Sequence, residues 1–192
     1  MSTPKILAFA GSAREDSFNR KLLRIAVDGA RKAGADVTVA EMRDYPMPLY
    51  DGDLEARECL PENAKKFKAL MLQHQGLLLA CPEYNSSVTP LLKNTIDWCS
   101  RPAPGEKSLA CFTGKVAGLV AASPGALGGL RGLVHVRSIL GNIGVLVVPE
   151  QRAVPKAQEA FSEDGKLKDD KLREGVEEVG ARVAQVLAKL TA

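Results

Sequence analysis

Short apolar runs alternate with longer amphipathic segments along most of the chain, and this alternation limits the fold more than any other feature. The apolar runs are Lys5–Ala10, Asp36–Ala40, Leu77–Cys81, Val116–Ala121 and Val145–Val148. Mostly unbroken hydrophobicity over so few residues is typical of strands that are buried on both faces. Segments with helical spacing lie between and after the runs. The pattern therefore predicts a parallel sheet with helices on both faces.

The predicted helices carry recognisable start and stop signals. The first places apolar residues at every fourth position from Phe18 to Ala30 and ends near Gly34. Thr89 and Pro90 suit the cap and the first position of a helix that runs to Cys99. The other helices are predicted over Pro61–His74, Leu127–Leu140 and Asp170–Leu190. Long connections remain over Met42–Leu60, Ser100–Lys115 and Pro149–Asp169, and their length is typical of binding loops or subunit contacts.

Five strands with intervening helices favour a flavodoxin-like three-layer sandwich. We expect a five-stranded parallel sheet in the order 2-1-3-4-5 rather than the six strands of a dinucleotide-binding fold. A chain of 192 residues, 45% of them hydrophobic, is long enough to bury a core without support from disulfides or metals. No internal repeat or domain boundary is visible. Residues 1–192 are therefore predicted to form one domain.

Composition and charge argue against several function classes. A formal net charge of +3 is too small for nucleic-acid binding to be expected. No apolar run reaches the length of about eighteen residues that a membrane helix needs. The N-terminus offers only Lys5 before a short apolar run, which does not fit a secretory signal, so a cytoplasmic protein is predicted.

The cysteines indicate neither a metal site nor a disulfide framework. Cys59, Cys81, Cys99 and Cys111 form no C-x-x-C pair, and His74 and His135 are the only histidines. A structural zinc site is therefore not expected. We predict that all four are buried, reduced thiols.

Three loops of unusual sequence follow the first, third and fourth strands, at the edge where open parallel sheets bind ligands. The first loop, Gly11–Asn19, reads G-S-A-R-E-D-S-F-N and leads into a helix that Ser17 caps. Free N–H groups and the helix dipole favour an anion there, and Arg14 adds a forked cation suited to phosphate. The alternative is an ordinary capped turn. Neither a G-x-G-x-x-G nor a G-x-x-x-x-G-K-[ST] motif occurs, so a Rossmann pyrophosphate loop is disfavoured and a P-loop is excluded.

The other two loops are suited to a flat ligand. The second loop, Cys81–Ser87, reads C-P-E-Y-N-S-S, and Tyr84 beside Glu83 suits a partly polar ring. The third loop, Ser123–Gly129, reads S-P-G-A-L-G-G, and its glycines let the backbone approach a ligand closely. A polar turn and tight helix packing are the plain alternatives. Taken together, one phosphate site and two ring-lining loops describe a mononucleotide such as FMN better than a dinucleotide.

These loops, with P-L-L-K-N-T-I-D-W soon after the second and L-R after the third, resemble the NAD(P)H-dependent FMN reductases. That flavodoxin-like family includes quinone, azo-dye and chromate reductases. The resemblance runs from roughly Lys5 to Pro149 and implies an FMN site built from all three loops. The residues that it assigns to FMN are Ser12, Arg14, Ser17, Phe18, Asn19, Pro82, Glu83, Tyr84, Asn85, Ser86, Ser123 and Gly125. Ser86 departs from the family, in which many members carry an aromatic residue at this position.

The resemblance also implies a two-step reaction. A bound flavin would accept hydride at N5 from NADPH or NADH and then reduce a quinone, azo compound, flavin or chromate-type acceptor. No catalytic side chain and no metal is expected. The resemblance further implies a homodimer or homotetramer with the flavin near the interface. The composition of Met42–Leu60 and Arg101–Lys107 leads us to expect that these segments close the pocket from a partner chain. His135 could serve a subunit contact or a substrate pocket, of which the contact is favoured, whereas Trp98 is predicted to be core or interface and His74 structural.

Other functions of the same fold stay open. A flavodoxin-type electron carrier would also hold flavin, but such carriers resemble one another in being strongly acidic, unlike this chain. A non-enzymatic FMN-binding sensor module would bind flavin without turnover. A phospho-receiver domain is disfavoured because the third strand ends Ala80-Cys81-Pro82, without the aspartate that such a domain needs.

Overall fold

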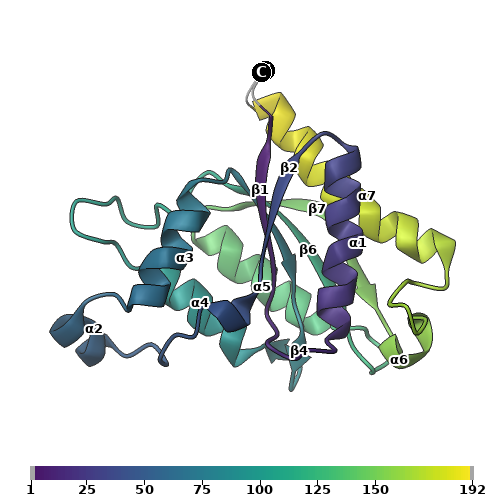
Figure 1. Cartoon of the computed structure of the whole chain (residues 1–192), viewed down its shortest axis with the longest axis horizontal. Helices are drawn as coiled ribbons and strands as arrows, with labels where there is room; N and C mark the ends of the chain where they lie inside the picture. The colour runs from purple at the N-terminus through teal and green to yellow at the C-terminus, as the bar shows by residue number, and fades with distance from the viewer. Residues whose placement is uncertain (1–2, 191–192) are drawn as a thin grey trace.

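The computed structural model describes residues 3–190, which form a parallel sheet between two layers of helices (Figure 1). The strand order is β2-β1-β3-β6-β7, with every neighbouring pair parallel. Counted over the sheet strands alone this is 2-1-3-4-5, which confirms the predicted flavodoxin-like order. The strands are β1 (Lys5–Ala10), β2 (Asp36–Ala40), β3 (Gly76–Ala80), β6 (Val116–Ala122) and β7 (Leu146–Val154).

Each face of the sheet carries its own hydrophobic core. Helices α1 (Phe18–Lys32) and α7 (Asp170–Leu190) cover one face. Helices α3 (Glu62–Leu72), α4 (Pro90–Ser100) and α5 (Leu130–Asn142) cover the other. Alternate residues of β3 enter the two cores, and all of its residues are buried. The unbroken apolar runs therefore reflect strands that are covered twice.

The predicted caps of α1 and α4 are present. Thr89 is the N-cap of α4, where its Oγ1 accepts a hydrogen bond from the N–H of Leu92 at 3.4 Å and Pro90 opens the helix. Gly34 lies just past α1 with a positive φ of 88°. Within the described residues no helix is long and apolar enough to cross a membrane.

The structure corrects the predicted boundaries at several places. β7 continues to Val154, so the predicted connection from Pro149 begins with strand; a proline is tolerated there because β7 is an edge strand. β3 begins and ends one residue earlier than predicted, and β6 ends one residue later. α5 begins at Leu130 rather than Leu127, because Gly128 and Gly129 have positive φ values of 62° and 93°.

Short elements occupy what the sequence indicated as plain connections. Residues 42–60 contain η1 (Met42–Asp44) and α2 (Gly52–Glu58), and α6 (Ala157–Ala160) follows β7. A two-stranded hairpin, β4 (Glu83–Tyr84) and β5 (Ser87–Val88), lies within and just after the second loop. These elements have too few residues to show a hydrophobic period in the sequence.

The prediction of four buried thiols is wrong for Cys59. Cys81, Cys99 and Cys111 are buried, but Cys59 is exposed at the end of α2 with a φ of 62°. The residue lies outside any periodic segment, so the sequence contained no signal of its exposure.

Helices α1 and α7 touch backbone to backbone at two glycines. A Cβ added to Gly29 would overlap the carbonyl oxygen of Glu177, and one added to Gly180 would overlap that of Ala26. The absence of both side chains therefore sets the spacing of these helices, and with it the position of α1 over the sheet.

We predict opposite effects for the same substitution at two helical glycines. Gly180→Ala should lower the free energy of unfolding by about 2 kcal/mol or more, because its new methyl group has no space against α1. Gly141→Ala, in α5, meets nothing within 4 Å and should raise the free energy of unfolding by about 0.5 kcal/mol through helix propensity. Urea unfolding measures both; equal effects would contradict the close packing.

Candidate functional site

The three loops meet at the carboxyl edge of the sheet, as the topology requires. Backbone hydrogen bonds continue past the strand ends and join them: Gly11 N–H to Ala80 O at 2.9 Å, and Cys81 N–H to Val120 O at 2.8 Å. Ser123 N–H donates to Val154 O at 3.1 Å. The starting points of all three loops are therefore held by the sheet itself.

Residues of all three loops line one hollow. A narrow part of about 70 Å³ is bounded by the lining residues Ser12, Arg14, Ser17, Phe18, Asn19, Pro82, Glu83, Tyr84, Ala122, Ser123 and Pro124. A wider part of about 450 Å³ shares Ser12, Arg14 and Tyr84 with it and reaches the start of α4 at Thr89, Pro90 and Leu91. The wider part alone has the volume expected of a site for a small organic ligand.

Nine of the twelve predicted site residues line the narrow part of this hollow. The other three, Asn85, Ser86 and Gly125, lie in the second and third loops but line neither part of the hollow. Ala122 and Pro124 line the narrow part as well and were not predicted. Their position beside Ser123, at the end of a strand, was the available signal.

Two arginines fasten the first loop from outside the hollow. Arg43 donates to the carbonyl of Ala13 at 2.8 Å, and Arg20 donates to those of Glu15 at 2.9 Å and Arg14 at 3.3 Å. Glu41 in turn holds Arg20 through an ion pair of 2.8 Å. The carbonyl oxygens of Ala13, Arg14 and Glu15 are therefore bonded to guanidinium groups, so their lone pairs do not face an anion in the hollow.

The start of α1 offers hydrogen-bond donors to the hollow. Ser17 is the N-cap and only 4% exposed, yet its side chain makes no capping bond. The first N–H groups of a helix have no intrahelical acceptor, so the donors of this turn are free for a ligand. Arg14 forms no ion pair within the described residues. The arrangement suits an anion.

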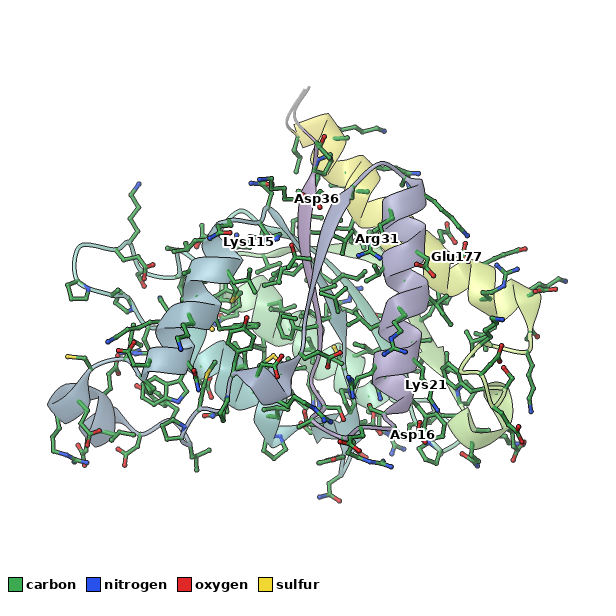
Figure 2. All side chains as sticks on the ribbon, in the orientation of Figure 1. Asp16, Lys21, Arg31, Asp36, Lys115 and Glu177 are labelled. Atoms are coloured by element: carbon green, nitrogen blue, oxygen red, sulfur yellow. The ribbon has the colours of Figure 1, made fainter. Side chains whose placement is uncertain are left out.

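A neighbouring ion pair takes up the nearby negative charge. Lys21 contacts Asp16 at 2.5 Å and holds the pKa of that carboxyl below its usual value, chiefly through this hydrogen bond. Figure 2 shows the two side chains together at the N-terminal end of α1. Asp16 is therefore ionised and paired at neutral pH, and Arg14 is the charged side chain of the first loop for which residues 3–190 supply no ion pair.

Asn19 joins the first loop to the third. Its Nδ2 donates to the carbonyl of Ala122 at 2.8 Å, and its Oδ1 accepts from the N–H of the same residue at 3.0 Å. Asn19 is only 4% exposed. The sequence indicated a ligand donor here. The structure shows that its amide oxygen and nitrogen hold the end of β6 against α1, while Asn19 also lines the hollow.

The second loop turns tightly at its centre. Asn85 and Ser86 have positive φ values of 50° and 64° between the paired residues Tyr84 and Ser87. Two left-handed residues in a two-residue hairpin loop form the turn whose twist matches that of the strands. The turn holds Tyr84 at the mouth of the hollow with 54% of its surface exposed.

Several residues that might suggest other chemistry are occupied elsewhere. Trp98 is fully buried and donates to the carbonyl of Pro48 at 2.8 Å, which confirms a core residue. His74 contacts Leu70 O at 2.7 Å and Thr38 Oγ1 at 2.9 Å, in line with its predicted structural role. Complete burial raises the pKa of the Cys81 thiol, so Cys81 is no nucleophile. Residues 3–190 contain no cluster of three or more metal-ligating side chains.

Comparison with known proteins identifies similar chains. The model of the NADPH-dependent FMN reductase family matches residues 4–159. An NAD(P)H-dependent FMN reductase of Pseudomonas aeruginosa is 36% identical over 176 residues, which cover 91% of this chain and 90% of that protein. An NADPH:quinone oxidoreductase of Arabidopsis thaliana is 30% identical over 191 residues, which cover 98% of this chain and 90% of that protein.

A solved structure agrees with these relatives. The NAD(P)H:(acceptor) oxidoreductase FerB of Paracoccus denitrificans superposes with a TM-score of 0.80 at 25% identity. The superposition covers 97% of this chain and 98% of that one.

We predict that Asn19→Ala lowers the free energy of unfolding by roughly 1 to 3 kcal/mol, because it leaves the buried N–H and C=O of Ala122 without partners. Asn63→Ala is the matched control, since it removes one exposed bond to Pro46 O and should cost under about 1 kcal/mol. Chemical unfolding of both variants measures the difference. Equal costs would contradict the role given to Asn19.

Proposed function

The chain belongs to the NADPH-dependent FMN reductase family, and we propose that FMN binds where its three loops meet and that quinones are its acceptors. As a member of this family it is an NAD(P)H-dependent FMN oxidoreductase. The observation that carries the proposed site is the shared hollow, which brings Arg14, Tyr84 and Ser123 together from three separate loops.

The residues of the first loop fit a phosphate. Ser17 is a buried N-cap whose hydroxyl bonds none of the helix N–H groups, and the first turn of α1 has unpaired donors. Arg14 supplies a guanidinium without a carboxylate partner in the described chain, and Ser12 lines both parts of the hollow together with Arg14 and Tyr84. Neutral donors, a helix N-terminus and one free cation form the donor set that a phosphate monoester requires.

The wider part of the hollow fits a flat ring. Its volume is about 450 Å³, and its lining combines the aromatic side chain of Tyr84 with the apolar side chains of Pro90 and Leu91. When bound, FMN would supply the hydride chemistry between the nicotinamide and the acceptor. The protein's own residues bind and orient: Arg14 and Ser17 fix the phosphate, and the hairpin that carries Tyr84 limits the position of the ring.

Quinones are the acceptors that we propose first, because the Arabidopsis relative, similar over almost the whole chain, is an NADPH:quinone oxidoreductase. Azo compounds, free flavin and chromate-type ions are the further acceptors to test. We also propose that residues 1–192 act as one domain, in the cytoplasm. The free thiols support a reducing compartment.

We further propose a homodimer or homotetramer. The two segments expected at the interface lie beside each other, around a mostly apolar hollow of about 580 Å³ lined by Glu55, Cys59, Leu60, Lys65, Pro102, Ala103 and Pro104. Leu49, in the first of these segments, is 77% exposed. Apolar surface of this kind supports association. A monomer in sedimentation velocity at micromolar concentration would contradict it.

Removing the guanidinium of Arg14 should weaken the binding of FMN but not that of riboflavin, which has no phosphate. We expect Arg14→Ala to raise the dissociation constant of FMN about tenfold to a hundredfold, the range for a hydrogen bond to a charged group. Riboflavin affinity should stay within about twofold. Arg24→Ala, an exposed arginine of α1 outside the lining, is the control for net charge. Flavin fluorescence titration measures both ligands; an unchanged FMN affinity in Arg14→Ala would remove the phosphate site.

The function itself is tested by the visible spectrum. Protein incubated with FMN and freed of excess should keep flavin absorption, and the bands should bleach on addition of NADPH or NADH without oxygen. Addition of a benzoquinone should restore them. Bands that persist with both nucleotides would indicate a carrier or sensor, and absence of retained flavin would contradict the site.

A further inference from the structure

The helix that follows the third loop receives its cap from the second loop. Glu83 Oε2 accepts a hydrogen bond from the N–H of Gly132, in the first turn of α5, at 2.7 Å. The N-cap of α5 is Gly129, which has no side chain to satisfy these N–H groups. The carboxylate of Glu83 also carries the charge that the N-terminus of a helix favours. Glu83 therefore performs for α5 what a capping side chain performs within its own helix.

Two more side-chain bonds fasten the hairpin to the same turns of α5. Arg131 Nη1 donates to Ser86 Oγ at 3.0 Å, and His135 Nδ1 lies 2.9 Å from Ser87 Oγ. Glu83 packs directly on this turn, since a Cβ at Gly132 would lie in van der Waals contact with its Cβ and Cγ at 3.4 Å. Glu83 makes the shortest of these three contacts and has the only charged acceptor among them.

Glu83 also completes a set of cross-links among the three loops. Asn19 joins the first loop to the end of β6, where the third begins. Thr89 Oγ1, just after the hairpin, donates to the carbonyl of Gly11 in the first loop at 2.9 Å. Glu83 joins the second loop to the helix that follows the third. Each pair of loops is thus joined by at least one side-chain bond. Removal of the Glu83 carboxylate takes away the charged bond between the hairpin and α5 and leaves only those of Ser86 and Ser87 among the side-chain bonds described.

We propose that Glu83 is a positioning residue for the flavin ring, which acts by fastening the hairpin that carries Tyr84 to the first turn of α5. The inference rests on the proposed FMN site. It assigns to Glu83 a role through Gly132 and Tyr84 rather than a bond to the cofactor. The phosphate half of the site, built on α1 and Arg14, keeps its own contacts when Glu83 changes.

Three variants test this role. Glu83→Ala should raise the dissociation constant of FMN about tenfold and alter the visible circular dichroism of the bound flavin, which reports the surroundings of the ring. Glu83→Gln keeps an uncharged acceptor for Gly132 N–H and should therefore retain most of the FMN affinity and most of the wild-type dichroism spectrum. Asp169→Ala is the matched control, because Asp169 Oδ1 caps α7 by accepting from Leu172 N–H at 2.9 Å, away from the hollow. It should lower the melting temperature as Glu83→Ala does while leaving FMN binding unchanged.

The outcomes separate this inference from the proposed function. If wild-type protein binds FMN and Glu83→Ala binds it within about twofold with an unchanged dichroism spectrum, the positioning role is wrong and the FMN site stands. Equal weakening by Asp169→Ala would also overturn the role, since it would trace the effect to stability alone. Wild-type protein that binds no FMN would overturn both. If Glu83→Ala does not fold, Glu83→Asp, whose carboxylate is one methylene shorter, takes its place with the same expectation.

Discussion

In a parallel sheet that is covered by helices on both faces, a ligand can reach the chain only where the strands end. β3 lies between β1 and β6, and helices bury both of its sides, so its backbone groups and side chains are all engaged. Polar side chains that would be costly inside are placed where β1, β3 and β6 end. The close α1–α7 contact at Gly29 and Gly180 holds α1 over the sheet and thereby aims its N-terminus at this edge.

Side-chain bonds to the backbone turn the three loop ends into one site. The sheet places the loops beside one another, but each loop leaves its strand on a separate course. Asn19, Thr89 and Glu83 each join two of them through a backbone N–H or C=O. Such bonds orient the ligand-facing groups without using them, which is the support that a preorganised site requires. Arg14 and Tyr84 line the hollow, and their side chains form no ion pair or hydrogen bond with the part of the chain that the structure describes.

Helices and strands with enough residues to show a period were predictable from the sequence. The N-cap positions at Ser17 and Thr89 and the start of α7 at Asp170 follow from local patterns. The strand order was instead expected from the number of strands and the fold that this number favours. The extension of β7 past Pro149, and the short elements α2 and β4–β5, were not. Pro149 is typical of a break, and only the edge position of β7 makes it harmless.

The sequence by itself determined the doubly covered sheet, the loops that carry the polar residues, and the chemical types that suit a phosphate and a ring. Hydrophobic period, capping residues and motif spacing are local properties, and these conclusions needed nothing else. Tertiary structure decided which side chains face the hollow and which hold the loops. In the motifs, nothing distinguishes the role of Asn19 and Glu83 from that of Arg14 and Tyr84. The hydrogen-bond partners of the first two, Ala122 and Gly132, lie 103 and 49 residues away. Bonds over such separations depend on strand order and helix placement, which no local pattern encodes.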